Sequence, residues 1–205
     1  MKLYLAPGAC SLSPHIALRE AGLDFQPVRV DLASKRTADG RDFNGINPKG
    51  YVPALELASG EVLTEGTAIV QYIADLAPSS HLAPANGTLE RYKLQEWLGF
   101  INSELHKAWS PLWRATTPED TKTAAREAIH RRLTYVAQKL ETQPWLMGDT
   151  FTVADCYLYV MLLWAKFTGV DLAGLPVLEA YRDRISARPA VQATLEAEKA
   201  LRAQP

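Results

Sequence analysis

The chain has 205 residues, 47% of them hydrophobic, which is enough apolar material for one large domain or two small ones. Its 22 basic and 23 acidic side chains nearly cancel, so no summed positive field would draw it to nucleic acid or to an anionic membrane. No apolar run approaches the roughly 18 residues that span a bilayer, and the first residues lack a signal-peptide core. We therefore expect a cytoplasmic protein without nucleic-acid or membrane partners.

The first part of the chain predicts a βαβ unit followed by a hairpin and a helix. Residues 2–6 and 27–32 have the pattern of short strands, and the helix between them has Ser13 as its expected N-cap and Pro14 at its first position. Strands joined in this way are parallel. Residues 34–49 are polar and predict an irregular stretch with at most a short helix. The hairpin is expected at residues 53–63 and the closing helix at residues 67–76.

Composition changes after Pro78. Residues 78–87 have the turn chemistry of a linker, and only helical periodicity follows. One helix carries a capping box of Thr152 and Asp155, which we interpret as a folding device. The predicted organisation is an α/β domain over residues 1–77, a linker over 78–87 and an all-α helical bundle over 88–205.

Cys10 is the first candidate for chemistry. It follows Gly8-Ala9 in the turn between the first strand and the first helix, where helix N–H groups and the helix dipole favour an anion. A buried structural cysteine is the alternative, but ligands bind at such turns in α/β folds. The residue three positions along is Ser13, so a two-cysteine redox motif is excluded in this loop, while a one-cysteine mixed disulfide is not. Cys156 lies in an apolar run and is expected to be buried.

Two further motifs lie in the same domain. Val52-Pro53 opens the third strand, where proline removes a ladder donor. Together with the cysteine loop and the βαβ pattern it resembles the thioredoxin fold, in which this proline is cis and the preceding backbone pairs with a bound peptide. Glu65-Gly66 begins the last helix of the domain. Glu65 alone is more often a carboxylate favoured by the helix dipole, but with the Gly66 N–H it could hold both ends of a zwitterionic amino acid.

Five separate motifs in order resemble the bacterial beta-class glutathione transferases, over essentially the whole chain. The matching runs are residues 7–15, residues 47–50 with 52–53, residues 63–66 with 68, 69 and 72, residues 103–107 and residues 151–155. The resemblance implies a thioredoxin-like first domain, an all-α second domain, a homodimer, glutathione as co-substrate and no metal.

The resemblance also implies roles for individual residues. Glutathione would pair its cysteinyl backbone with Val52, which precedes Pro53, and place its sulfur near Cys10. Lys35 would meet the glycyl carboxylate, although without the family it is more simply a surface lysine. The γ-glutamyl end would lie at Glu65 and Gly66. Further glutathione contacts are implied in the second domain, some of them across a dimer interface, at Gly99, Ser103, Glu104, Leu105 and His106.

The spacing of Gly99, Ser103 and His106 independently predicts a small and polar stripe on one helix face. Gly99 stands where asparagine is usual in this class, and Tyr51 where glutamine is common, so affinity or substrate choice could differ. We expect the electrophile pocket at Trp109, Leu112 and Trp113, although aromatic residues on a helix are more often core than pocket.

The predicted activity is a glutathione transferase, a detoxification enzyme that presents the glutathione thiolate to hydrophobic electrophiles, with Cys10 and His106 as catalytic residues. Three alternatives remain open at the level of sequence. Cys10 could itself carry out thiol-disulfide exchange through a mixed disulfide with glutathione. The protein could be a reductive dehalogenase, or a carrier that binds ligands without turnover.

Overall fold

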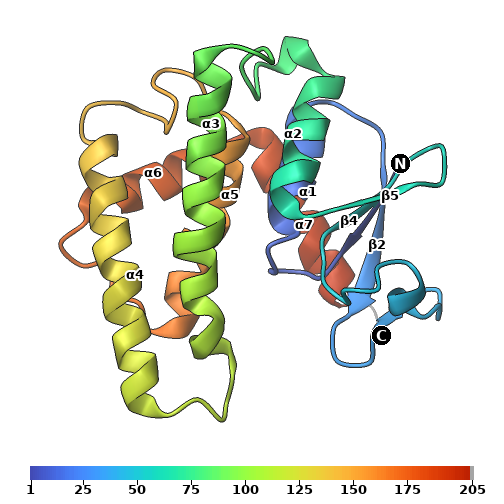
Figure 1. Ribbon diagram of the computed structural model, residues 1–205, viewed down its shortest axis with the longest axis horizontal. Helices are drawn as coiled ribbons and strands as arrows, with labels where there is room; N and C mark the ends of the chain where they lie inside the picture. The colour runs from blue at the N-terminus through green and yellow to red at the C-terminus, as the bar shows by residue number, and fades with distance from the viewer. Residues whose placement is uncertain (204–205) are drawn as a thin grey trace. The chain divides into compact units, whose positions relative to one another are not determined.

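The computed structural model describes residues 1–203, which form two compact units (Figure 1). The N-terminal unit comprises residues 1–83 together with the chain from Arg188 onward, and the helical unit comprises residues 84–187. The thioredoxin-like fold of the first unit and the all-helical character of the second confirm the predicted fold class.

A mixed five-stranded sheet in the order β3-β2-β1-β4-β5 forms the N-terminal unit. Strands β1 (Lys2–Leu5) and β2 (Gln26–Asp31) pair in parallel, as the βαβ pattern predicts. Strands β4 (Ala54–Glu56) and β5 (Val62–Thr64) form the expected antiparallel hairpin. The polar stretch additionally contains β3 (Arg36–Thr37), which was not predicted because two residues leave no periodic signal.

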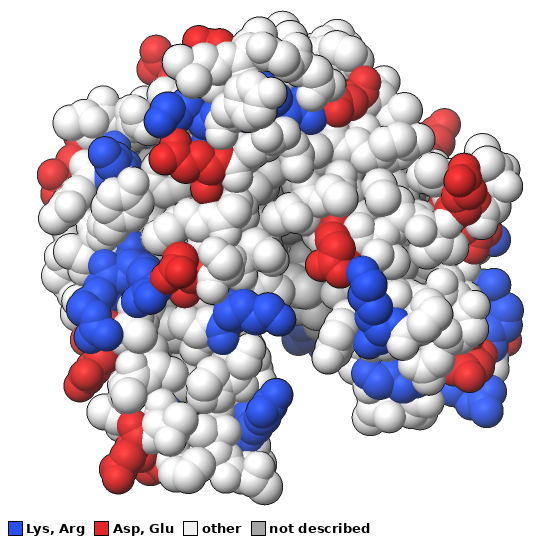
Figure 2. All heavy atoms as spheres, viewed as in Figure 1, with Lys and Arg blue, Asp and Glu red and all other residues white. Residues whose placement is uncertain are grey.

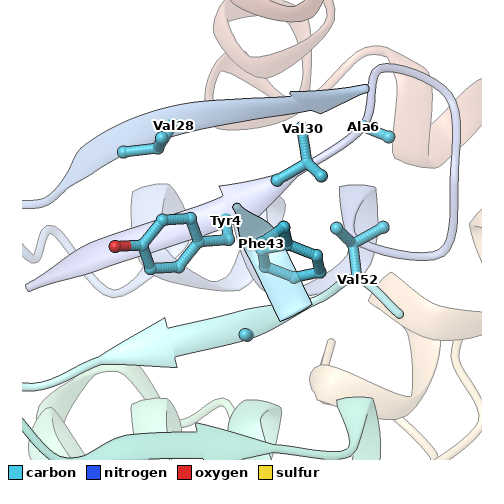
Figure 3. Packing of buried hydrophobic residues seen from close by; sticks show 7 residues of the cluster. Tyr4, Ala6, Val28, Val30, Phe43 and Val52 are labelled. Atoms are coloured by element: carbon cyan, nitrogen blue, oxygen red, sulfur yellow. The ribbon is translucent and has the colours of Figure 1, made fainter. Parts of the chain in front are cut away.

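A cluster of buried hydrophobic residues around Phe43 covers one face of the sheet, as shown in Figure 3. Tyr4 pairs with Val28 on one side and Ala54 on the other, so all three point to the same face. Phe43, from a short 3-10 helix at Phe43–Gly45, packs against Tyr4 with ring centroids 5.8 Å apart. Val52 belongs to the same cluster, so the segment before Pro53 is anchored by its buried side chain.

Helices α1 (Leu12–Glu20), α2 (Gly66–Leu76) and α7 (Pro189–Arg202) complete the N-terminal unit, and α1 packs against the other two. Helix α1 begins earlier than expected. Its N-cap is Ser11, and Ser13 lies inside the first turn with a buried hydroxyl. The prediction of Ser13 as N-cap was wrong because the Ser11 hydroxyl bonds back to the Ala6 backbone, which turns the chain into the helix two residues sooner.

The helical unit contains α3 (Leu89–Phe100), α4 (Glu119–Leu140), α5 (Val153–Thr168) and α6 (Pro176–Ser186). Thr88 caps α3 by accepting a hydrogen bond from the Arg91 N–H at 3.2 Å. The predicted capping box of α5 is also present. Helix α5 is buried along nearly its whole length, because its apolar residues lie on every face and other elements pack around it.

The chain beyond α3 does not continue as the predicted helix. A π-helical turn at Ile101–Leu105 leads into a 3-10 helix at His106–Trp113. Each change alters the number of residues per turn, so the stripe expected from α-helical spacing extends from Gly99 to Ser103 but not to His106. Turns of the π type recur at functional sites, which draws attention to this segment.

The compact units divide the chain differently from the expected domains. Helix α7, expected in the domain over residues 88–205, belongs to the N-terminal unit, where it packs on α1. A sequence pattern gives the apolar face of such a helix but not its partner. The linker expected over residues 78–87 contains a short 3-10 helix at Pro78–Ser80.

The surface agrees with the nearly balanced composition. On the face displayed in Figure 2, acidic and basic side chains are interspersed rather than gathered by sign. None of the helices between residues 1 and 203 combines the length and the apolar character needed to cross a membrane.

Candidate functional site

Cys10 and Val52 meet in the N-terminal unit, although 42 positions separate them in the sequence. The Cys10 thiol is half-buried and donates to the Val52 carbonyl oxygen at 3.3 Å. Cys10 stands one residue before the N-cap of α1, and its own carbonyl accepts from the Ser13 N–H at 3.1 Å. The Cys10 turn and the Val52-Pro53 segment, both noted in the sequence, are therefore in direct contact in the structure.

The backbone at Val52 offers a place for a peptide ligand. The Val52-Pro53 bond is cis, as the thioredoxin-like pattern predicts. The Val52 carbonyl already accepts from Cys10, and within residues 1–203 its N–H has no hydrogen-bond partner. A backbone N–H without a partner, just before a strand, can donate to the carbonyl of another extended segment, which then pairs in the manner of an added strand.

Glu65 has a conformation that the sequence did not predict. Its φ of 69° and ψ of 114° lie outside the regions that non-glycine residues usually adopt. Such backbone strain is concentrated at functional sites, where the surrounding structure maintains it. The Glu65 carboxylate accepts from the Lys49 ammonium group at 2.5 Å, and Lys49 also donates to Thr64 Oγ1 at 3.0 Å. Both charged side chains are exposed and therefore accessible to a ligand.

Gly66 lies against the proline of the cis bond. A Cβ built on Gly66 would be 3.8 Å from Pro53 Cγ, so the start of α2 and the Val52-Pro53 step are neighbours. The first N–H groups of a helix have no intrahelical acceptor, and the helix dipole favours an anion in front of them. Gly66 thus stands where a ligand carboxylate could bind.

Lys35 lies beside the same segment. Its ammonium group donates to the Gly50 carbonyl at 2.9 Å, and its φ is 55°. The side chain is half-buried and comes from the turn that follows β2. The structure therefore gathers all the residues proposed for the first domain around the Val52-Pro53 step: Cys10, Lys35, Val52, Pro53, Glu65 and Gly66.

His106, in the helical unit, is linked to Tyr157 and Asn102. Its Nδ1 lies 2.6 Å from the Tyr157 hydroxyl, which donates to Asn102 Oδ1 at 3.1 Å. A phenol has one proton, so this arrangement requires His106 Nδ1 to carry a proton and leaves Nε2 as an acceptor. Burial lowers the pKa of His106 to about 4, and the positive charge of Lys107 adds to the effect. His106 is therefore neutral at physiological pH, and its Nε2 can accept a hydrogen bond.

This low pKa predicts a pH dependence of stability. Because His106 takes up its proton near pH 4 when folded and near pH 6.5 when unfolded, its contribution is fully present above pH 6.5 and is lost as the pH falls towards 4. Between pH 7 and pH 5 we expect the free energy of unfolding to fall by about 2 kcal/mol from this residue alone. Urea unfolding of the wild type and of His106→Gln at both pH values measures this decrease. An equal decrease in unfolding free energy in the two proteins would contradict the prediction.

The neighbours of His106 in sequence occupy unlike environments. Ser103 Oγ donates to the Gly99 carbonyl at 2.9 Å, and Gly99 has open space where a side chain would project. Glu104 is exposed and accepts from Arg132 at 2.7 and 3.0 Å. The Leu105 side chain is fully buried, which fits a core role better than a direct side-chain contact with a ligand.

The aromatic residues near His106 surround Trp164. The Trp164 ring lies 5.0 Å from the His106 ring and 5.3 Å from the Trp113 ring, between centroids. Trp113 is 51% exposed and Leu112 is half-buried, so both are accessible to an apolar ligand. Trp109 has no exposed surface and donates to Thr168 Oγ1 at 3.1 Å. Trp109 is therefore a core residue and not part of an exposed pocket, the role that aromatic residues on helices more often have.

Three members of this group were not predicted from the sequence: Asn102, Tyr157 and Trp164. All are ordinary residues of helical segments, and only the packing of α5 against the π-helical turn brings them together. One signal was present, because Tyr157 places a hydroxyl in a mostly apolar helix and a buried hydroxyl requires a partner. Cys156, as expected, is fully buried. Within residues 1–203 no group of three or more His, Cys, Asp or Glu side chains is arranged to hold a metal ion.

Comparison with known proteins assigns both parts of the chain. Residues 1–75 match the model of the glutathione S-transferase N-terminal domain, and residues 100–189 match that of the C-terminal domain. A curated relative, the glutathione S-transferase GstA of Escherichia coli O157:H7, is 47% identical over 97% of this chain and 98% of its own. The chain therefore belongs to the glutathione S-transferase family.

Two solved structures agree with this assignment. A sphingomonad glutathione S-transferase complexed with glutathione is 52% identical, with a TM-score of 0.95 over 97% of this chain and 99% of that one. The beta-class glutathione S-transferase of Sphingomonas chungbukensis is 49% identical, with a TM-score of 0.94 over 97% of this chain and 98% of that one. The resemblance to the beta class that the motifs indicated is thus confirmed.

Proposed function

We propose that the protein conjugates the thiolate of glutathione to small hydrophobic electrophiles, in detoxification, as a cytoplasmic homodimer. The observation that carries the proposal is the contact of the Cys10 thiol with the Val52 carbonyl, beside a Val52 N–H that has no hydrogen-bond partner within residues 1–203. This arrangement suits the cysteinyl residue of glutathione, because one backbone hydrogen bond to Val52 brings the ligand sulfur towards Cys10.

The charged groups around Val52 match the two ends of the tripeptide. Lys35 would exchange its hydrogen bond with the Gly50 carbonyl for the glycyl carboxylate, a stronger charge-assisted contact. The γ-glutamyl end carries an ammonium group and a carboxylate. Glu65 would take the ammonium group, and the Gly66 N–H at the start of α2 would take the carboxylate.

The helical domain would supply a hydrogen-bond acceptor and the apolar wall. His106 Nε2, held as an acceptor by Tyr157, would accept a hydrogen bond from the glutathione thiol and so orient its sulfur. The thiol would give its proton to solvent, and the thiolate would then attack the electrophilic carbon. A carbon–sulfur bond forms, and the leaving group departs with its bonding electrons. Trp113 and Leu112 would contact the apolar part of the electrophile, and Ser103 and Glu104 would add polar contacts with glutathione.

A second candidate function follows from the position of Cys10. A sulfur placed next to the expected glutathione cysteinyl group could attack a glutathione mixed disulfide, displace the other thiol and be released by a second glutathione. In the transferase reaction the nucleophile is glutathione, and Cys10 only assists. The two functions therefore differ in whether the Cys10 sulfur forms a bond.

Replacement of Cys10 by alanine separates the two functions. We expect Cys10→Ala to retain conjugation of 1-chloro-2,4-dinitrobenzene within about tenfold of the wild type, because it removes one assisting group and leaves the nucleophile. Any glutathione-dependent reduction of a disulfide should be lost. Cys156→Ala is the matched control, since it removes the other, buried thiol and should leave both rates unchanged.

The same series can contradict the proposal. A wild-type protein that is retained on immobilised glutathione but turns over no compound in a panel of electrophiles would be a carrier. Loss of conjugation in Cys10→Ala by more than about a thousandfold would make Cys10 the nucleophile. Mass spectrometry of the protein incubated with oxidised glutathione then detects the mixed disulfide directly.

A further inference from the structure

A pocket of about 430 Å³ lies between the end of α1 and the start of α7, which are side by side in the N-terminal unit (Figure 1). Pockets that bind small molecules typically have volumes of about 300 to 1,000 Å³. None of the residues proposed for glutathione binding lines this pocket. Its walls include Phe25, Pro27, Ala190 and Ala193, and its charged residues are Arg19 and Asp24.

Arg19 brings a positive charge to this pocket that no carboxylate of residues 1–203 balances. Its side chain is half-buried, and its Nε is buried without a hydrogen-bond partner in that part of the chain. The neighbouring Glu20 pairs instead with Arg188, at 2.6 and 2.8 Å. Asp24 is exposed, and none of the ion pairs among the described residues includes it. Because arginine keeps its charge in proteins, this arrangement favours an anionic ligand.

The carbonyl groups at the end of α1 do not satisfy Arg19 either. They already accept from the N–H groups of residues 21–23, at 2.9 to 3.1 Å. The Arg19 guanidinium carbon lies 5.7 Å from the centroid of the Phe25 ring, and that ring also packs edge-on against His15 at 5.4 Å. The N–H donors of a guanidinium group lie in its plane, so contact of its face with a ring leaves them for an acceptor.

The start of α7 adds a partial positive charge on the other side of the pocket. The helix begins at Pro189, and its N-cap residue, Arg188, makes no side-chain capping hydrogen bond. The first N–H groups of a helix, here including that of Ala190, have no intrahelical acceptor, and the helix dipole favours an anion before them. Arg19 and the start of α7 therefore act in the same direction.

We propose that this pocket is a second ligand site, which binds a small monocarboxylate with an apolar body. The two carboxylate oxygens match the fork of N–H donors on Arg19. The apolar body would lie against Pro27 and against Ala190 and Ala193, whose small side chains leave room for it. The exposed carboxylate of Asp24 disfavours a ligand with a second negative charge.

This site is separate from the one proposed for glutathione. Arg19 and Cys10 are at opposite ends of α1, a helix of nine residues and therefore about 14 Å long. The two sites share no residue, so both can be occupied at once. Binding at the second site requires no turnover of glutathione, and its test is therefore independent of the proposed function.

Titration of the nitrogen-labelled protein with benzoate, followed by amide chemical shifts, tests the site. We expect saturable shifts at residues 22–25 and at Ala190 and Ala193, with a Kd of about 1 mM. Benzamide has the same shape without the charge, and acetate has the charge without the apolar body. Each should bind at least about tenfold more weakly than benzoate, because each lacks one of the two matched features.

Four variants locate the binding energy. Arg19→Met should raise the Kd for benzoate at least about tenfold, and Arg19→Lys, which keeps the charge without the fork, by about threefold. Arg36→Met removes an exposed arginine of the same unit and should leave the Kd within about twofold of the wild type. Ala193→Leu fills the pocket at constant charge and should weaken binding about fivefold, which keeps the test available if Arg19→Met does not fold.

Equal benzoate affinity in the wild type and in Arg19→Met would overturn the proposal, as would equal affinities for benzoate and benzamide. The absence of saturable shifts at residues 22–25 would overturn it too. The titration is repeated with glutathione present. An unchanged Kd for benzoate is expected, whereas a Kd that rises in proportion to glutathione would place benzoate in the glutathione site and overturn the second site.

Discussion

We expect Asp155→Ala to lower the free energy of unfolding by about 4 kcal/mol, the largest stability effect of any substitution proposed for this chain. The Asp155 carboxylate is fully buried and accepts four hydrogen bonds. They come from the Thr152 N–H at 2.7 Å, Thr152 Oγ1 at 3.0 Å, the Leu146 N–H at 2.9 Å and the Tyr181 hydroxyl at 2.6 Å. Alanine would leave two buried backbone donors without acceptors.

The Asp155 site combines a helix cap with a tertiary contact. Burial raises the pKa of the Asp155 carboxyl, and its four donors act against that shift. Burial and the adjacent carboxylate raise the pKa of Tyr181 well above its usual value, so its hydroxyl remains a donor. The Asp155 side chain therefore bonds a loop, caps α5 and joins α6 to α5. For this reason its removal should lower the free energy of unfolding by more than the removal of an ordinary N-cap, typically about 1 kcal/mol.

Chemical denaturation followed by tryptophan fluorescence measures the effect, since Trp145 packs on Tyr181 with ring centroids 5.9 Å apart. Asp155→Asn keeps one acceptor oxygen and should lower the free energy of unfolding by about half as much as Asp155→Ala. The control is Asp183→Ala, which removes an exposed carboxylate on α6 and should change stability by less than about 0.5 kcal/mol. A loss below about 1 kcal/mol in Asp155→Ala would contradict the prediction.

The second large effect concerns catalysis. We expect His106→Ala to lower kcat/KM for conjugation about hundredfold, the size of a lost catalytic hydrogen bond. Tyr157→Phe should lower kcat/KM about tenfold, because the His106 ring would remain but would lose the partner that keeps Nε2 an acceptor. Since the pKa of His106 is about 4, its ionisation should add no inflection to the wild-type rate between pH 6 and pH 8.

Tyr159 provides a matched control on the same helix. Its hydroxyl is bonded to Ser186 Oγ at 2.9 Å and has no contact with His106, so Tyr159→Phe removes the same group from α5 at a different place. Initial rates at varied glutathione and electrophile concentrations measure all three variants. Equal losses in Tyr157→Phe and Tyr159→Phe would show that the hydroxyl of Tyr157 acts only through stability.

Much of the candidate site in the first domain could be predicted because its determinants are local. Cys10 follows a turn, Pro53 precedes a strand and Glu65 precedes a helix, and each role depends on neighbours within a few residues. These positions lie at one edge of the sheet because β1 and β5 end there and β4, which is antiparallel to both, begins there. The pattern did not predict the positive φ of Glu65, because only the surrounding structure maintains that strain.

The second domain was predicted less completely. Helical periodicity locates an apolar face, but a π-helical turn changes the rotation of every later residue and leaves no periodic signal of its own. The pairing of His106 with Tyr157 depends on how two helical segments pack. The role of Trp109 was left between core and pocket for the same reason, and burial resolves it.

The sequence by itself determined the elements whose causes lie within a turn or a strand: the capping box of α5, the hairpin and the parallel pair around α1. Tertiary structure decided which distant groups meet. The contact of Cys10 with Val52, the hydrogen bond from the Gly8 N–H to the Glu198 carboxylate and the placement of α7 beside α1 all join residues far apart in the chain. A buried polar group requires a partner, but only packing selects which residue supplies it.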